Sequence, residues 1–261
     1  MKNRFYLIFI VLFFGCEGDV DINPTEIGLA NEESMPQGNL LAWYPFNGNA
    51  NDLSGNDYHG IVYGATLSQD RLNGNNRAYY FNNYTSDFPE NIKYDEERIE
   101  VDLNTESIST EMTIAWWFLN EGEGTISPRP FEFWVPGNGN GKLVINYPHI
   151  NPNQEILFEH VINGEPLFYS LPYGNNNEWV HYAYTIGNGE AKFYKDGELI
   201  HTEYVDTSSV LLGEDVAFGR MNHPAWDAFR GKLDDIVIYS RVLDNDEIKY
   251  FYNLIHSESY L

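Results

Sequence analysis

Oxygen-bearing side chains gather in one early stretch of the chain, residues 47–57. This stretch contains four Asn and two Asp among glycine and serine, and Asn49 and Asp52 are two of them. Such a loop can turn tightly and direct carbonyl and carboxylate oxygens at one centre, and oxygen is the ligand atom that Ca²⁺ prefers. The loop is too short to enclose an ion alone, so a calcium site here requires a second contributor.

Asp234 or Asp235 could be that contributor, because both begin an apolar run that ends at Tyr239. In a regular strand Asp234 shares a face with Ile236, whereas Asp235 lies on the other face. A carboxylate at the head of a buried row needs a partner, and Lys232 is the one basic residue nearby. Calcium held by Asn49, Asp52 and one or both of these carboxylates meets that need. The alternative is a turn-rich loop and a carboxylate bonded to backbone.

Aromatic residues in loops are the second set of candidates. Trp226 and Asp227 lie in a loop-like segment, Trp134 precedes a Gly/Asn-rich stretch, and Tyr147 lies in a proline-containing one. An exposed ring can stack on a sugar while neighbouring polar groups bind its hydroxyls. The alternative is that these rings pack loops onto the body of the domain.

No catalytic residue is predicted. Retaining glycoside hydrolysis needs two carboxyl groups about 5 Å apart, and the acidic pairs at suitable spacing include Glu100/Asp102 and Glu121/Glu123. The glycines around the second pair indicate a loop, and the first pair resembles an exposed strand face. Both are interpreted as solvated, and the seven His form no pair at metal-ligand spacing. The sequence therefore favours a binding protein over an enzyme.

Short alternating runs broken by Gly, Asn, Asp and Pro must position these candidates. Asp196-Gly197 separates two such runs, which predicts a β-hairpin with a type I′ turn. Asp244 and Glu247 form a capping-box pattern before an apolar stripe that extends to Ile255, which predicts one helix near the end of the chain. Many short strands with turn signals between them indicate an all-β sandwich or jelly roll.

Charge excludes one class of partner. The chain has 15 Lys and Arg against 39 Asp and Glu, a formal net charge of −24. A surface this negative repels phosphate backbones, and no basic stripe is present. Nucleic acid and anionic lipid headgroups are therefore not expected partners.

The N-terminus has the features of an export signal. Lys2 and Arg4 precede an apolar run at 5–14 that is too short to span a bilayer. The run ends at Gly15-Cys16, which holds the sole cysteine. This resembles the lipobox of bacterial lipoproteins, in which the signal is cleaved and the cysteine is lipidated. Residues 16–38 indicate a flexible acidic tether, whose acidic start resembles a surface-export signal of Bacteroidetes lipoproteins.

Three segments resemble the laminin-G-like jelly rolls of the concanavalin A-like lectin/glucanase superfamily. They are 40–60, which begins with Leu-Leu-Ala-Trp-Tyr; 178–199, with its Phe-Tyr-Lys-Asp-Gly turn; and 218–243, with its Leu-Asp-Asp-Ile-Val. The resemblance implies two facing antiparallel sheets, often with a structural calcium that Asp52 and Asp234 would share. It implies no reaction, because lectins, adhesion modules and glucanases share this fold.

The expected fold is therefore an all-β, concanavalin A-like sandwich of two antiparallel sheets with one short C-terminal helix. The expected organisation is a signal peptide at 1–15, the tether at 16–38, the domain at 39–256 and a tail at 257–261. We expect a monomeric lipoprotein on the outer membrane, in contact with lipid through Cys16 alone, that binds glycan. The alternative is an adhesion or structural module with a protein partner, and a glycoside hydrolase is the third hypothesis.

Overall fold

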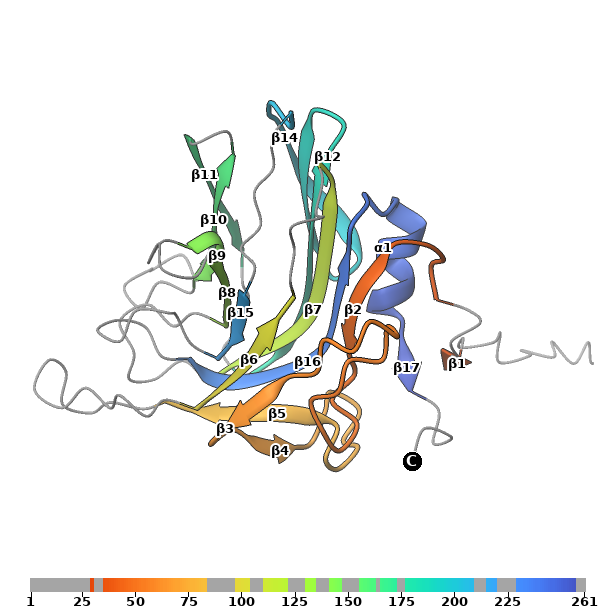
Figure 1. Cartoon of the computed structure of the whole chain (residues 1–261), viewed down its shortest axis with the longest axis vertical. Coiled ribbons are helices and arrows are strands. Elements are labelled where there is room, and N and C mark those ends of the chain that lie inside the picture. The colour runs from red at the N-terminus through yellow and green to blue at the C-terminus, as the bar shows by residue number, and fades with distance from the viewer. Residues whose placement is uncertain are drawn as a thin grey trace, which may run out of the picture.

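A computed structural model of the chain describes most of the expected domain (Figure 1). The described residues are 29–30, 35–83, 97–103, 110–121, 130–134, 141–146, 155–162, 165–172, 177–208, 215–219 and 229–256. The signal peptide, Cys16, most of the tether and the tail lie outside them. Within the described ranges, no helix has both the length and the apolar character needed to cross a membrane.

Strands make up nearly all of the regular structure. In chain order they are β1 Leu29–Ala30, β2 Leu40–Tyr44, β3 Ile61–Tyr63, β4 Thr66–Ser68, β5 Ala78–Asn82, β6 Arg98–Asp102, β7 Met112–Asn120, β8 Phe131–Trp134, β9 Gly141–Asn146, β10 Glu155–Ile162, β11 Glu165–Pro172, β12 Trp179–Gly187, β13 Glu190–Lys195, β14 Glu198–Tyr204, β15 Asp215–Phe218, β16 Arg230–Tyr239 and β17 Ile255–His256. The helix α1 spans Asn245–Tyr252.

The strands form two facing antiparallel sheets, as expected. One sheet has the order β11-β10-β9-β8-β15-β6-β3, and the other has the order β14-β13-β12-β7-β16-β5-β4 with β2 also paired to β16. Consequently β11 and β14 are edge strands at one side of the sandwich, and β3 and β4 are edge strands at the other (Figure 1). A separate parallel pair joins β1 to β17.

Local sequence explains the strands and their turns. Strand β10 alternates half-buried and buried residues along its whole length, which is the pattern of a strand with one face in a core. The predicted hairpin is confirmed: Asp196 and Gly197 have φ of 50° and 77° between β13 and β14. Positive φ at both central residues gives a type I′ turn its twist, which matches that of the flanking strands.

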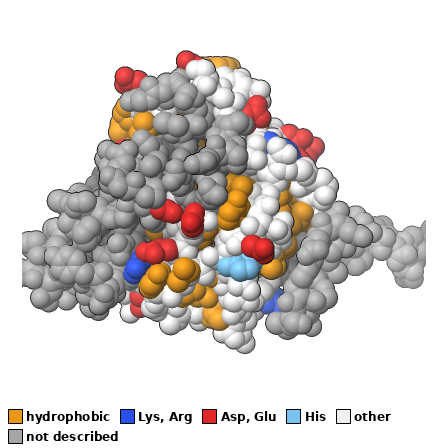
Figure 2. Space-filling model, viewed as in Figure 1, with side chains coloured by type: hydrophobic (Ala, Val, Ile, Leu, Met, Phe, Trp, Pro, Cys, Tyr) orange, Lys and Arg blue, Asp and Glu red, His pale blue; other side chains and the backbone are white. Residues whose placement is uncertain are grey.

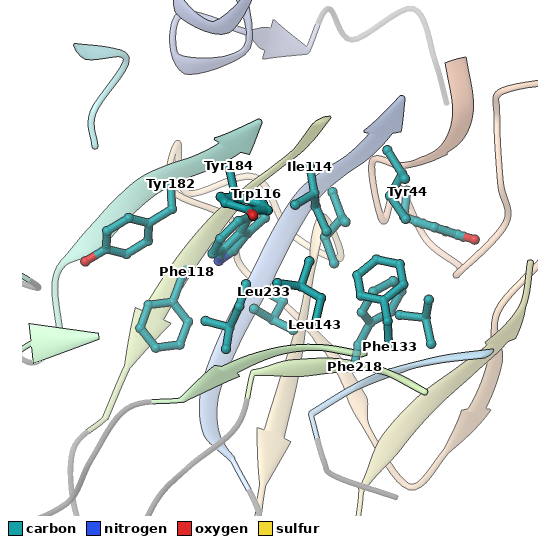
Figure 3. Packing of buried hydrophobic residues seen from close by; sticks show 14 of the residues in the cluster. Tyr44, Ile114, Trp116, Phe118, Phe133, Leu143, Tyr182, Tyr184, Phe218 and Leu233 are labelled. Carbon is teal, nitrogen blue, oxygen red and sulfur yellow. The ribbon is translucent and has the colours of Figure 1, made fainter. Parts of the chain in front are cut away.

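The main core lies between the sheets and is rich in aromatic rings (Figure 3). The sheet that runs from β14 to β4, called the β14–β4 sheet below, contributes Trp116, Phe118 and Tyr182 to this core. Their side chains point toward Phe133 and residues near it on the facing sheet. Phe118 stacks on the ring of Phe229 at 5.2 Å between centroids. Large rings bury much apolar area, so this layer holds the two sheets together.

The helix covers the outer face of the β14–β4 sheet, where a second apolar cluster contains Ile248 and Phe251. The Asp244 side chain accepts a hydrogen bond from the Glu247 backbone N–H, and Glu247 reciprocates, so the predicted capping box is confirmed. The prediction that Ile255 continues the helical stripe is wrong. The helix ends at Tyr252, and Ile255 pairs as part of β17.

Strand β16 contains a bulge that sequence alternation did not predict. Its register against β7 shifts between Asp234 and Val237, and Asp235 has φ of 48°. The inserted residue puts Leu233 and Ile236 in the same intersheet core, while Asp234 pairs with Trp117. The prediction that Asp234 shares a face with Ile236 is therefore wrong, because a bulge changes the alternation by one residue.

Candidate functional site

The loop that carries Asp52 uses its polar atoms to fold onto itself. Each carboxylate oxygen of Asp52 accepts two hydrogen bonds: Oδ1 from the backbone N–H of Trp43 (2.9 Å) and of Ser54 (2.8 Å), and Oδ2 from Ser54 Oγ (2.7 Å) and the Tyr58 N–H (3.2 Å). Asn49 Oδ1 accepts from the Asn51 N–H at 2.8 Å. A carboxylate has about four acceptor positions, so those of Asp52 are filled.

Asp234 and Asp235 have a different partner, Arg71, which lies in the connection between β4 and β5. Nη1 of Arg71 donates to Asp234 Oδ2 at 3.1 Å and, in a shorter contact, to Asp235 Oδ2. Nη2 donates to the backbone carbonyl of Leu254, just after α1. All three charged side chains are 6% exposed or less. Sequence reasoning sought a nearby base and missed Arg71, since 163 residues separate it from Asp234.

The electrostatics of this cluster follow from its burial. Removal from water raises the pKa of the Asp234 carboxyl well above its usual value, with a further rise from Asp235 and an opposing effect from Arg71. Burial alone lowers the pKa of Arg71, but the two carboxylates outweigh it and raise that pKa. The guanidinium therefore keeps its charge inside the protein.

Aromatic side chains surround the guanidinium on the outer face of the sheet. Arg71 Cζ lies 4.6 Å from the centroid of the Trp117 ring, and Trp117 stacks on Tyr252 of the helix at 5.6 Å. His181 packs 5.4 Å from Trp117, is 1% exposed, and its Nδ1 has no hydrogen-bond partner among the described residues. Burial, with Arg71 as the next cause, lowers the pKa of His181 to about 3. This histidine is neutral at physiological pH.

The predicted calcium ligands do not fit that ion in this arrangement. The acceptor positions of Asp52 are filled by donors of its own loop, and Asp234 and Asp235 face a cation that the chain itself supplies. Within the ranges that the structure describes, no group of three or more Asp, Glu, His or Cys side chains is placed to hold a metal ion. The structure thus does not assemble the set of Asn49, Asp52, Asp234 and Asp235.

A groove of about 370 Å³ opens between the edge strands β11 and β14, away from this cluster. Its lining is mainly apolar, from Ile162, Pro166, Leu167 and Val205, and it includes the carboxylates of Glu165 and Asp206. Behind it, the ring of Tyr169 on β11 stacks on His201 of β14 at 3.9 Å and 12°. This stack connects the two edge strands, β11 and β14.

Two exposed aromatic rings lie next in sequence to residues of the groove, but neither of them lines it. Tyr204, the last residue of β14, is 78% exposed, and Phe168 of β11 is 55% exposed. Figure 2 shows hydrophobic and acidic side chains close together at the upper end of the molecule, where Figure 1 places these strands. An apolar floor and hydrogen-bond acceptors are features that bind the faces and hydroxyls of a sugar.

The residues predicted to stack on sugars are not tested by this geometry. Trp226, Asp227 and Tyr147 lie outside the described residues, and for Trp134 only the backbone, in β8, is described. The groove residues were missed. Alternation in Glu165–Pro172 could have indicated an edge strand with an exposed Phe168, but the sequence does not reveal that β11 faces β14.

The acidic pairs considered for catalysis have other roles where they are described. Glu100 Oε1 accepts from Arg98 Nε at 2.5 Å on the same strand, and Asp102 is exposed at its end. Glu121 pairs with Arg230 at 3.1 Å and accepts from the Tyr80 hydroxyl. These ion pairs account for both glutamates without any reaction.

Comparison with known proteins defines the class of this chain. The family model described as "Concanavalin A-like lectin/glucanases superfamily" (Laminin_G_3) matches residues 95–249, which is more than half of the chain. The chain therefore belongs to this laminin-G-like family, and its fold is the jelly roll of that superfamily. No curated protein matches it at a significant level.

Several solved structures share this fold. They include the binding domain of botulinum neurotoxin DC in complex with rat synaptotagmin II (TM-score 0.61, 15% identity) and the same domain in complex with SialylT (TM-score 0.61, 17% identity). A third structure is of botulinum neurotoxin type C, whose cell entry is described as dependent on interaction with two ganglioside molecules (TM-score 0.61, 16% identity). Each match covers 82% of this chain and 51% of the other, so this chain spans about half their length.

Proposed function

We propose that this chain is a non-catalytic carbohydrate-binding domain and that its binding site is the groove between β11 and β14. The observation that carries the proposal is the combination in one opening of an apolar floor with two acidic residues, Glu165 and Asp206. Sugar rings present apolar C–H faces and hydroxyl donors, which match this combination. Fold relatives that bind a sialylated ligand and gangliosides support a glycan ligand.

The charge of the groove favours uncharged or amino sugars. Glu165 and Asp206 line it, and the whole chain carries a net charge of −24. Carboxylated or sulfated sugars, including sialylated glycans like those of the fold relatives, would meet like charge at close range, which costs binding energy. The relatives therefore support a glycan as the kind of ligand, whereas the groove favours a different charge. The proposed ligand class is therefore a neutral or basic glycan.

A glycan array probed with residues 35–256 tests the proposal. Glu165→Ala and Leu167→Ala should each weaken binding to the preferred glycan, because one removes the acceptors of a carboxylate at the groove and the other removes part of its apolar lining. Asp57→Asn is the matched control, since that exposed acid lies in the loop at 47–57 and does not line the groove. Binding that is equal in all four proteins would place the glycan site elsewhere.

A second candidate function, binding of a protein partner, is favoured by the edge of β14. Leu199 and Ile200 are 40% and 41% exposed there, and within the described residues β14 pairs only with β13. An open edge with apolar side chains can accept a strand from another chain. This function would be favoured if the protein bound no glycan on the array and if Ile200→Lys abolished its binding to a protein partner.

Export and lipid attachment complete the proposal. The charged start, the apolar run at 5–14 and the single Cys16 support a lipoprotein anchored at the outer membrane and exposed at the cell surface. Metabolic labelling with a palmitate analogue should mark the wild-type protein and not Cys16→Ser. Digestion of intact cells with an external protease should then remove the anchored domain if it faces outward.

A further inference from the structure

The two aspartates of β16 occupy a junction in the sheet. On one edge of β16, residues 230–233 pair with β5 and residues 236–239 pair with β2, and β7 pairs along the other edge. Asp234 and Asp235 fall between the β5 and β2 segments, at the bulge. Among the residues that the structure describes, no strand pairs with this short stretch on that edge, and the two carboxylates are buried there.

The side chain of Arg71 fills this junction. It arrives from the β4–β5 connection, donates to both carboxylates and to the Leu254 carbonyl, and packs against the ring of Trp117. A planar guanidinium satisfies several acceptors at fixed angles, and its delocalised charge tolerates burial better than an ammonium does. One side chain thus ties together β4–β5, the β16 bulge and the end of α1.

We propose that this junction is a cation site whose resident cation is the guanidinium of Arg71, in place of a divalent metal ion. The positive charge that joins the β4–β5 connection to the β16 bulge therefore comes from a side chain of the protein. At this junction the fold therefore needs no calcium, and a divalent ion and Arg71 compete for the same oxygens.

Loss of the guanidinium would leave a set of oxygens suited to a hard cation. Asp234, Asp235 and the Leu254 carbonyl would lose their shared donor. Asp70 is 4% exposed, its Oδ2 has no hydrogen-bond partner among the described residues, and its charge acts on both Arg71 and Asp234. Two carboxylates and a carbonyl are oxygen ligands of the kind that Ca²⁺ and lanthanide ions prefer, and the charge of Asp70 adds to the negative potential around them. Arg71→Ala is therefore expected to create a divalent-cation site.

Terbium luminescence provides the direct test, because Trp117 lies 4.6 Å from the position of the guanidinium carbon and can sensitise a bound Tb³⁺ ion. Wild-type protein, Arg71→Ala and the triple variant Arg71→Ala/Asp234→Asn/Asp235→Asn are titrated with Tb³⁺ under tryptophan excitation. Arg241→Ala is the matched control. Arg241 also pairs with a carboxylate, that of Glu247, and packs on an aromatic ring, but at 23% exposure.

We expect sensitised emission from Arg71→Ala alone, and its loss in the triple variant. Thermal melts should agree: the wild type melts at the same temperature in EDTA and in calcium, whereas calcium raises the Tm of Arg71→Ala by roughly 5–10 °C at about 100 times its Kd. Arg241→Ala should melt earlier with no response to calcium.

Two results would overturn the inference. One is a wild-type protein whose Tm falls in EDTA, or whose Tb³⁺ emission disappears in Asp234→Asn, because a metal then already binds the carboxylates. The other is an Arg71→Ala protein that is folded by circular dichroism yet binds no Tb³⁺. The wild-type measurement decides the calcium question even if Arg71→Ala does not fold.

Discussion

Acidification should unfold this domain through a single buried side chain, His181. This histidine lies on β12 beneath Trp117 and Tyr252, is 1% exposed, and has a pKa lowered to about 3. In the unfolded chain the pKa of a histidine is about 6.5. Between these values the unfolded state binds one more proton than the folded state, so the free energy of unfolding decreases as the pH falls from 6.5 toward 3.

The size of the effect follows from the difference in pKa. About 3.5 pKa units at ~1.36 kcal/mol each correspond to a maximum of roughly 5 kcal/mol near pH 3. At pH 5 the loss from His181 is already about 2 kcal/mol. Asp234, whose pKa is raised in the folded state, acts in the opposite direction, so the contribution of His181 is the difference between the wild type and a variant that lacks this histidine. Domains of this kind have ~5–15 kcal/mol of total stability, so the loss is a large fraction of it.

Urea denaturation at pH 7 and pH 5 measures this contribution. Wild-type protein should lose about 2 kcal/mol more between the two pH values than His181→Phe, which keeps an aromatic ring against Trp117 and Tyr252 but cannot bind a proton. His201→Phe is the control, since the His201 side chain is 31% exposed. Equal losses in the wild type and in His181→Phe would refute the reasoning, because His181 would then be accessible to protons or bonded in its charged form.

Four further substitutions test other parts of the fold. Gly231→Ala should cost about 3 kcal/mol or more in urea denaturation, because its Cβ would lie 2.1 Å from the Leu119 carbonyl oxygen; Gly48→Ala, with φ of 82° but open space around it, should cost about 1 kcal/mol. Thr113→Val should cost about 1–3 kcal/mol, since the buried Leu243 N–H would lose its bond to Thr113 Oγ1 at 2.9 Å. Asp244→Ala should lower the Tm by roughly 2–4 °C through loss of the ~1 kcal/mol helix cap, and a Tm unchanged within error would show that packing alone holds α1.

The fold could be predicted wherever local chemistry decides the structure. The Asp196-Gly197 turn and the Asp244–Glu247 capping box each depend on residues close in sequence, and both are confirmed. The β16 bulge could not be predicted, because the alternation rule assumes that successive residues of a strand point to opposite faces. The bulge at Asp235 inserts an extra residue and shifts this alternation. The predicted extent of the helical stripe was wrong for a related reason. Ile255 continues the apolar period of the helix, but its backbone pairs with β1.

The candidate sites depended on contacts between distant segments, which a single sequence does not reveal. Asp234 was correctly singled out as a buried charge that needs a partner, and its burial at 0% exposure is confirmed. The partner was missed because Arg71 belongs to a hairpin connection with no motif of its own. The groove was missed because β11 and β14 belong to different sheets and are separated in the sequence. The two edge strands lie opposite each other only in the folded sandwich.

The parallel pairing of β1 with β17 determines how the domain can be handled. Leu29 and Ala30 run beside Ile255 and His256, so the two described ends of the chain leave the body at the same place. Figure 1 shows that place on the side of the helix, remote from the edges of β11 and β14. A biotin tag fused at either end would therefore orient the protein on a sensor chip with the groove between β11 and β14 toward the flowing sample.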